Sequence, residues 1–381
     1  MNPKKYNNIK LAISISKGIF TFILLFLFVA MGFSLKLEVF LGNFASGSYL
    51  LLIIFVLTIG FAGSVISFPV SYYSEFYLEH KNNLSNQTFM QWIWEDLKGL
   101  LVSLVIGIPV LLIFFYSLNK FGDLWWLPFA IILFLLSVIL ARLVPVIILP
   151  LFYKIIPLED DVLKTKIRLL AEKAGIKVEN VYKFNMSKNT KKANAAFTGL
   201  GKSKRILLGD TLLENYTADE IETVIAHELG HYKKKHIIKN LFIGTVSSFL
   251  MLFLIAYLYS ISLGWFDFRS ITQIAALPLL SLWAMLVGLV LTPLTNIISR
   301  KFEYEADEYA VIETGKKKAF TDTLEKLTDQ NMGDKEPHPF VEWFFYSHPS
   351  IKNRINAINK INTASAGKHD EAENKFKFEG N

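Results

Sequence analysis

The chain has 381 residues, of which 52% are hydrophobic and 19% are charged, and it contains no cysteine. This apolar composition argues against a disordered protein. The lack of cysteine excludes disulfides, cysteine nucleophiles and cysteine-ligated zinc, so any bound metal needs histidine and carboxylate ligands. The formal net charge is +7. We attribute it to lysines that flank membrane segments and face anionic lipid, and we expect no nucleic-acid partner.

Six apolar windows are each close to or above the length that crosses a bilayer as a helix. They are Leu11–Leu35, Tyr49–Ser71, Gly99–Leu118, Leu124–Ala141, Ile237–Leu263 and Ile271–Leu294. They predict a mainly α-helical, polytopic membrane protein with about six to seven spans. The stretch Leu143–Tyr153 is also apolar, but Pro145 and Pro150 favour an exit or interfacial segment over a further span.

The motif His227-Glu228-Leu229-Gly230-His231 matches the H-E-x-x-H pattern. Upstream of it, Thr217 and Glu220 form a capping box that is typical of a helix start, and apolar residues follow at spacings of three and four. On that helix His227 and His231 lie one turn apart on one face. Two imidazoles so placed can share one zinc ion, and Glu228 can reach the attacking water. The alternative is a pair of solvated histidines.

A catalytic zinc needs a third protein ligand, and the segment Arg300–Ala310, which follows the last apolar window, is the best source. This segment is predicted to be helical, and Glu303 and Asp307 are four residues apart, hence on one face. Glu303 can ligate the metal, while Asp307 can accept a hydrogen bond from the outer N–H of a ligating histidine. Glu305 and Glu308 are expected on a solvated face, although spacing alone does not force the choice of Glu303.

Two further segments are candidates for substrate contact. The segment Asn194–Gly199, followed by Arg205–Gly209, is predicted to form a strand, a turn and a second strand. Its edge can bind an extended peptide, and an ordinary hairpin is the alternative. Near the end of the chain, His348 precedes a proline and Arg354 follows. A histidine there can stabilise an oxyanion, and a plain turn histidine is the alternative.

Taken together, these segments resemble the integral-membrane zinc metalloproteases typified by the type I CAAX prenyl endopeptidase. The resemblance covers nearly the whole chain. It is carried in order by Glu79–Thr88, Trp94–Lys98, Leu149–Leu158, Asn194–Phe197, His227–His231, Phe302–Asp307, Pro337–Pro339 and Tyr346–Pro349 with Arg354. Members of the family cleave the last three residues from prenylated C-terminal CAAX peptides, and some members also cut substrates elsewhere.

The resemblance implies a role for each matching residue. One zinc ion per chain would be held by His227, His231 and Glu303, with Glu228 as the general base. Asp307 and Arg354 would support the metal ligands from behind, and His348, with Arg354 nearby, would contact the substrate carbonyl. The strand Asn194, Ala195, Ala196 and Phe197 would hold the peptide.

The expected organisation follows the apolar windows. It comprises a membrane domain with four spans (1–153), a first protease segment with the H-E-x-x-H helix (154–236), two spans (237–294), a second protease segment (295–362) and a disordered tail (363–381). The H-E-x-x-H helix is expected to continue through Lys233–Lys235 into the fifth span. Lysine and arginine in the loops place both termini and the protease domain in the cytosol. The membrane is that of a bacterial cell or, in a eukaryote, of the endoplasmic reticulum.

The sequence therefore predicts a membrane zinc endopeptidase that acts on CAAX-type peptides and contacts the lipid bilayer. Three alternatives stay open. The first is a quality-control protease with the same site that acts on unprenylated membrane proteins. The others are a transporter and an inactive membrane scaffold. The sequence leaves the oligomeric state open.

Overall fold

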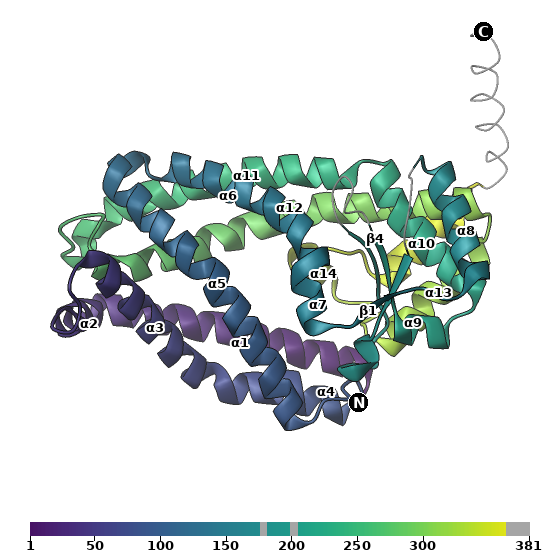
Figure 1. Ribbon diagram of the computed structural model, residues 1–381, viewed down its shortest axis with the longest axis horizontal. Helices are drawn as coiled ribbons and strands as arrows, with labels where there is room; N and C mark the ends of the chain where they lie inside the picture. Colours follow the sequence, from purple (N-terminus) through teal and green to yellow (C-terminus); the bar gives the residue numbers. More distant parts are fainter. Residues whose placement is uncertain (176–180, 199–204, 363–381) are drawn as a thin grey trace, which may run out of the picture. The chain divides into compact units, whose positions relative to one another are not determined.

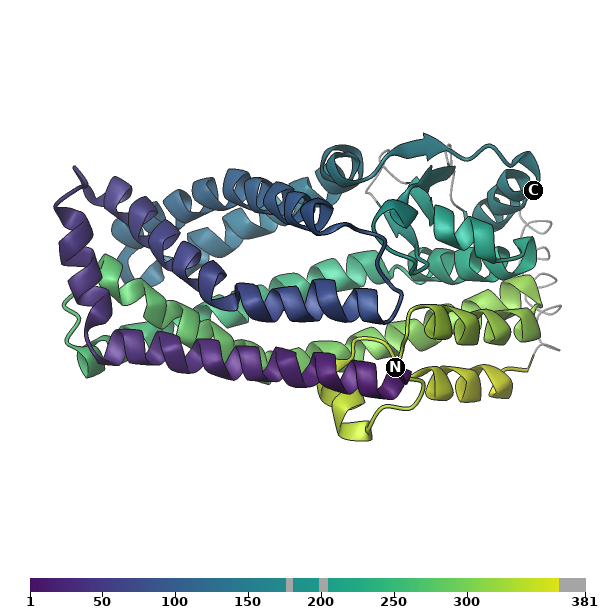
Figure 2. The ribbon, with the colours of Figure 1, turned by 90° about the horizontal axis from the view of Figure 1, so that it is seen from below.

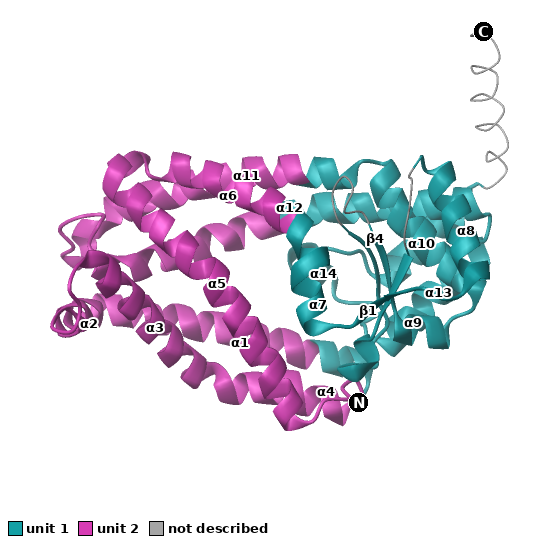
Figure 3. Ribbon diagram, viewed as in Figure 1, with its two compact units in different colours: residues 1–7, 142–240, 293–381 teal, residues 8–141, 241–292 magenta. Residues whose placement is uncertain are grey.

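The structure is a computed structural model that describes residues 1–175, 181–198 and 205–362 (Figure 1). The chain divides into two compact units (Figure 3). Unit 1 comprises residues 1–7, 142–240 and 293–381, and unit 2 comprises residues 8–141 and 241–292. The tail 363–381, predicted to be disordered, lies outside the described residues.

Unit 2 consists of helices and short helical turns. Its helices, several of which extend into unit 1, are α1 (Pro3–Ala30), α2 (Phe33–Gly42), α3 (Ser48–Ser71), α4 (Leu78–Lys81), α5 (Phe89–Phe121), α6 (Trp126–Leu143), α11 (His236–Ser262) and α12 (Leu277–Thr314). Across the described ranges, six helical segments are long and apolar enough to cross a membrane. The prediction of a polytopic, mainly α-helical membrane protein is confirmed.

Some predicted boundaries of the apolar helices were wrong. The first span was expected to run to Leu35, but α1 ends at Ala30, because Gly32 adopts a left-handed backbone (φ 69°) and α2 starts a new helix. The segment Leu143–Tyr153, expected as an exit or interfacial segment, forms no further span among the described residues. A π-helical turn (Val144–Ile148) and α7 (Leu149–Phe152) continue α6, so one helical segment runs from Trp126 to Phe152.

The core of unit 2 is made where α3 meets α5. Leu52 and Phe55 of α3 are almost fully buried, and they pack in one cluster with Phe115 and Leu118 of α5. Most other apolar side chains on these helices stay exposed, as expected for surfaces that face lipid rather than water.

Unit 1 contains a four-stranded sheet in the order β1-β2-β4-β3. Its strands are β1 (Ile155–Pro157), β2 (Val181–Phe184), β3 (Ala195–Thr198) and β4 (Arg205–Gly209). The central β2 and β4 are parallel, whereas β1 pairs with β2 and β3 pairs with β4 in antiparallel fashion. The predicted pairing of the two later strands is confirmed, and their connection, 199–204, lies outside the described residues. Strand β3 ends the sheet, so among the described residues no further strand pairs with its outer edge.

Unit 1 also contains the helices α8 (Asp161–Lys173), α9 (Asp210–Asn215), α10 (Ala218–Lys233), α13 (Lys317–Gln330), α14 (Pro339–Phe345) and α15 (Ile351–Lys360), together with α7 and the C-terminal part of α12. Of these, α8, α9 and α10 pack against this sheet. Apolar residues of α8 and α10 form one buried cluster with those of β4, among them Ile167, Leu208 and Leu229. Helix α13 packs against α15 (Figure 2).

Helix α10 carries the H-E-x-x-H motif and begins as predicted. Thr217 accepts a hydrogen bond from the backbone N–H of Glu220, and the Glu220 side chain accepts one from the backbone N–H of Thr217, which completes the capping box. The helix does not continue into the fifth span as expected. It ends at Lys233, Lys235 takes a left-handed backbone (φ 59°), and α11 begins at His236.

Candidate metal centre

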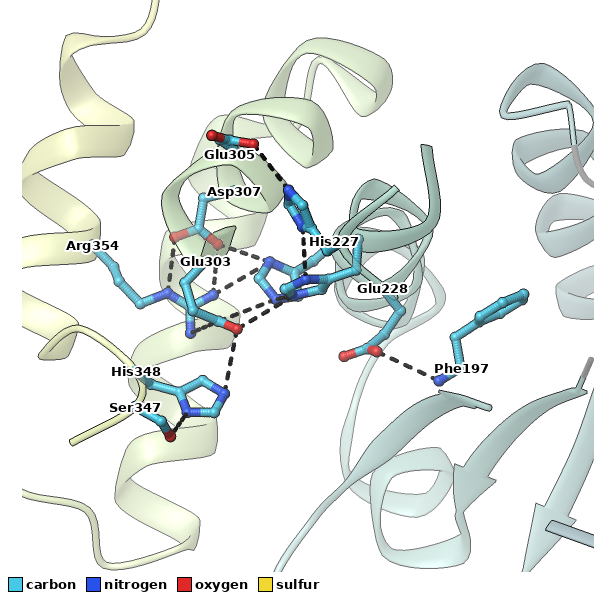
Figure 4. A network of polar contacts seen from close by, with 11 residues as sticks. Phe197, His227, Glu228, Glu303, Glu305, Asp307, Ser347, His348 and Arg354 are labelled. Carbon is cyan, nitrogen blue, oxygen red and sulfur yellow. Dashed lines mark hydrogen bonds and ion pairs between the residues drawn. The ribbon is translucent and has the colours of Figure 1, made fainter. Parts of the chain in front are cut away.

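The two histidines of the motif point to the same place. Ile225 and Leu229 anchor α10 in the core, which leaves His227 and His231 together on the opposite side of the helix. Their Nε2 atoms are 3.2 Å apart. His227 is buried, and His231 is partly buried. Figure 4 shows the polar contacts that gather around His227.

Glu303 completes a three-residue group, although it is 72 positions beyond His231 in the chain. Its two carboxylate oxygens lie 3.4 Å from His227 Nε2 and 3.3 Å from His231 Nε2. One ligand atom from each of the three residues lies within 4.8 Å of the others. Among the described residues, His227, His231 and Glu303 form the one group of at least three histidine or acidic side chains that could hold a metal ion.

The chemistry of these three residues fits a divalent cation. Oε2 of Glu303 is buried and has no hydrogen-bond partner, so a strong acceptor faces the two imidazoles. Burial alone would lower the pKa of His227, but the carboxylates of Asp307 and Glu303 next to its ring nitrogens outweigh burial and raise the pKa to about 9. The pocket thus favours positive charge at this imidazole. Two imidazoles and one carboxylate are the ligand set of many catalytic zinc sites.

The outer nitrogen of His227 contacts Asp307. His227 Nδ1 lies 2.8 Å from Asp307 Oδ1. Arg354 of α15 donates hydrogen bonds to both oxygens of this carboxylate, at 2.8 and 2.6 Å. Because all three side chains are buried, the carboxylate fixes the orientation of the imidazole, and the guanidinium fixes the carboxylate. Arg354 therefore lies behind Asp307 and holds the carboxylate that contacts His227.

The outer nitrogen of His231 has a partner that the sequence interpretation missed. His231 Nδ1 lies 3.0 Å from Nδ1 of His236, and His236 Nε2 lies 2.9 Å from Oε2 of Glu305. Glu305, which was expected on a solvated face, is partly exposed and also contacts His236, whereas Glu308 is exposed as expected. The spacing of five residues between His231 and His236 gave no helical signal, because a turn separates the two.

Glu228 lies between the histidine pair and the edge strand. Its Oε2 accepts a hydrogen bond from the backbone N–H of Phe197 at 3.4 Å (Figure 4). The carbonyl of Asn194 accepts from the N–H of Gly209, so Asn194 faces β4. Since residues alternate along a strand, the backbone groups of Ala195 and Phe197 face the open edge, and those of Ala196 face β4. Of the four predicted residues, Ala195 and Phe197 therefore have backbone groups at the unpaired edge of the strand.

His348 lies on the loop before α15, on the other side of Glu303. Its Nε2 is 3.4 Å from Glu303 Oε1, and its Nδ1 is 3.0 Å from the hydroxyl of Ser347. The side chain is 64% exposed, so it can reach a bound ligand. The structure thus brings His348 next to the three-residue group, as Figure 4 shows.

Gly230 lets α10 approach α12 closely enough to form this group. A Cβ at this position would lie 3.1 Å from the backbone of Ala306 and 3.1 Å from the ring of Tyr309. We expect Gly230→Ala to lower the free energy of unfolding by about 1–3 kcal/mol and to reduce the metal bound per chain, because it pushes the two helices apart. Gly244→Ala, on α11, is the control, since its Cβ would meet nothing within 4 Å. Equal melting temperatures and metal contents for the two variants would contradict this account.

The sequence matches two protein-family models. Residues 157–362 match peptidase family M48, and residues 2–154 match a model described as CAAX prenyl protease N-terminal, five membrane helices. Within residues 2–154, four described helical segments are long and apolar enough to cross a membrane.

Similar proteins are found in yeast and in bacteria. CAAX prenyl protease 1 of Saccharomyces cerevisiae is 32% identical over 318 residues, which cover 78% of this chain and 70% of that protein. An uncharacterized metalloprotease of Bacillus subtilis, YhfN, is 29% identical, and the match covers 97% of this chain and 87% of that protein. The crystal structure of S. mikatae Ste24p superposes with a TM-score of 0.84 at 29% identity, over 93% of this chain and 88% of that chain.

Proposed function

For this chain, which belongs to peptidase family M48 and is a membrane metalloendopeptidase, we propose that the metal is zinc. We also propose that its substrates are CAAX-type, prenylated C-terminal peptides. The products would be a shortened protein and the last three residues as a peptide. The observation that carries the proposal is the convergence of His227, His231 and Glu303 beside the open edge of β3.

We assign the metal to these three residues, with one zinc ion per chain. When bound, zinc supplies Lewis-acid chemistry: it lowers the pKa of a water molecule and polarises a carbonyl. Side chains of the protein orient the ligands. Asp307 holds the proton of His227 on Nδ1, which keeps Nε2 free to ligate, and Arg354 keeps Asp307 in place.

Glu228 acts as the general base in this proposal. Its carboxylate takes a proton from the attacking water and passes that proton to the amine that leaves. The Glu228 carboxylate lies 3.4 Å from the backbone nitrogen of Phe197 on the edge strand. This supports the assignment, because a peptide paired with β3 would lie within reach of the carboxylate. His348 donates a hydrogen bond to the oxyanion of the tetrahedral intermediate, which its exposure next to Glu303 allows.

The peptide is held by strand addition. Ala195 presents its N–H and C=O groups, and Phe197 its C=O group, at the edge of β3, whereas the N–H of Phe197 donates to Glu228. An extended peptide can pair with this edge in the manner of a further strand. Main-chain pairing accepts many sequences, so side-chain and lipid preferences must come from elsewhere in the protein. Asn194 is exposed at the start of the strand and can add a side-chain contact.

We place the protease domain on the cytosolic side of the membrane. Lysine and arginine residues are frequent in 142–236 and after 300, whereas the loop 264–270 has Arg269 alone. The positive-inside rule therefore supports a cytosolic site. Prenylated C-termini also lie at the membrane surface, since a single lipid chain inserts there.

Glu303→Ala should reduce bound zinc because it removes one of three protein ligands. We expect well under one zinc ion per chain, measured by elemental analysis after dialysis against a weak chelator. Glu308→Ala is the matched control, since Glu308 is exposed on the same helix. Normal zinc content in Glu303→Ala would move the third ligand to another residue, such as Glu305.

The substrate proposal is tested with two peptides that share one CAAX ending and differ only in farnesylation. Purified protein is incubated with each, and the products are identified by mass spectrometry, with chelator as a control. Cleavage of the farnesylated peptide alone, three residues from its end, would support the proposal. Cleavage of both peptides, or at other bonds, would instead indicate a protease with broader membrane-protein substrates.

A further inference from the structure

His236 is a buried histidine beside the metal centre that the proposed mechanism does not use. It is the first residue of α11, and 1% of its surface is exposed. The turn before it contains Lys235 in the left-handed conformation, which is uncommon for a residue with a side chain. That turn folds the start of α11 back so that His236 meets His231 across 3.0 Å, measured between the two Nδ1 atoms.

The proton positions along this contact follow from the geometry. His231 Nε2 faces Glu303 and His227, so Nε2 is the nitrogen that would ligate the metal. A neutral ligating imidazole carries its proton on the other nitrogen, here Nδ1. His231 Nδ1–H must then donate to His236 Nδ1. His236 consequently carries its own proton on Nε2 and donates it to Glu305, 2.9 Å away.

Further contacts hold His236 and Glu305 in place. The His236 ring stacks on Phe302, with ring centres 4.3 Å apart and planes 9° from parallel. Lys239 lies 3.6 Å and Lys301 4.0 Å from the Glu305 carboxylate. These cations favour the negatively charged form of Glu305, which accepts the hydrogen bond from His236. These contacts fix both nitrogens of His236, so packing and hydrogen bonding agree on one ring orientation.

We propose that His236 and Glu305 form a hydrogen-bonded relay that positions the metal ligand His231, as Asp307 positions His227. This inference rests on the proposed zinc site but not on the proposed substrate. The two ligands are supported differently. His227 donates directly to a carboxylate that Arg354 holds, whereas His231 donates to a neutral imidazole that stands between it and the carboxylate of Glu305. His236 is a positioning residue, since it touches the ligand and not the reacting atoms.

The test separates hydrogen bonding from packing. His236→Phe keeps an aromatic ring that can stack on Phe302 but removes both nitrogens. His236→Asn loses the ring but restores an acceptor near the position of Nδ1. The zinc dissociation constant is measured on the full-length protein in detergent by competition with a chromophoric chelator. We expect His236→Phe to raise the constant about 10- to 100-fold and His236→Asn to recover most of that loss.

Two further variants keep the relay testable if His236→Phe folds poorly. Glu305 is partly exposed, so its replacement disturbs packing less. Glu305→Leu should weaken zinc binding, and Glu305→Gln, which still offers an oxygen to His236, should weaken it less. Cobalt substituted for zinc gives a second readout, because its absorption bands shift when a ligating imidazole rotates.

His80→Phe is the matched control, because His80 also lies against a phenylalanine ring, that of Phe76 at 4.2 Å, but it belongs to unit 2. This variant should bind zinc as the wild type does. Wild-type zinc affinity in His236→Phe, or equal losses in the Phe and Asn variants, would overturn the relay and leave the proposed protease intact. A wild-type chain with no measurable zinc affinity would overturn the zinc site and the relay together.

Discussion

Glu228→Gln should lower the rate of peptide hydrolysis by about 10²- to 10⁴-fold and leave the bound metal unchanged. Glutamine keeps the size of the side chain but cannot take a proton from the attacking water. The metal ligands are untouched, because Glu228 contacts the backbone N–H of Phe197 and not the histidine nitrogens in the described structure. The measurement is a single-turnover cleavage assay on the purified variant, with zinc content determined on the same sample.

The control for this experiment is Glu222→Gln, a residue of the same helix that pairs with Lys316 instead of facing the site. It should retain wild-type hydrolysis and zinc. Undiminished cleavage by a preparation of Glu228→Gln that is free of other proteases would remove Glu228 from the role of general base. Loss of zinc along with activity would indicate that Glu228 helps to hold the metal or the fold.

Arg354→Met should lower the free energy of unfolding by about 3–5 kcal/mol, because it leaves the buried carboxylate of Asp307 without its cation. The guanidinium donates to both oxygens of Asp307, and both residues are buried. Zinc affinity should also fall, since Asp307 then no longer holds His227 in one orientation. Arg354→Lys should restore little, because an ammonium cannot make the paired contact. Unfolding in detergent and zinc content are the measurements.

A second substitution separates the two effects of Arg354. Adding Asp307→Asn to Arg354→Met removes the stranded charge and should recover part of the stability, but it should not recover zinc affinity. Lys352→Gln is the matched control on α15, because Lys352 pairs with Glu336 at the surface. We expect it to change stability by about 0.5 kcal/mol or less. Similar destabilisation by Lys352→Gln and Arg354→Met would mean that α15 as a whole, and not its buried arginine, is responsible.

The membrane helices and the H-E-x-x-H helix could be predicted from the sequence because their signals are local. A run of apolar residues long enough to cross a bilayer indicates a helix wherever it occurs. The capping box at Thr217 and Glu220 starts α10 without help from distant residues. The one-turn spacing of His227 and His231 then dictates that the two imidazoles share a face. Membership of peptidase family M48 agrees with this local pattern.

The ends of the helices were less predictable, since they depend on single turns. Hydropathy does not change at Gly32, yet a left-handed backbone ends α1 there. The break at Lys235 was missed for the same reason, because lysine is a good helix former and no local signal marks its left-handed conformation. That break decides where His236 lies.

Local patterns in the chain are enough to predict a helical membrane protein with a histidine pair suited to one metal ion. The packing of the helices determines which distant groups meet that pair. Spacing could not choose between Glu303 and Glu305, but the packing of α12 against α10 at Gly230 turns Glu303 to the histidines and Glu305 to His236. Likewise Arg354 reaches Asp307 because α15 packs beside α13 and α12. These contacts join residues far apart in the chain, and their geometry depends on how whole helices pack.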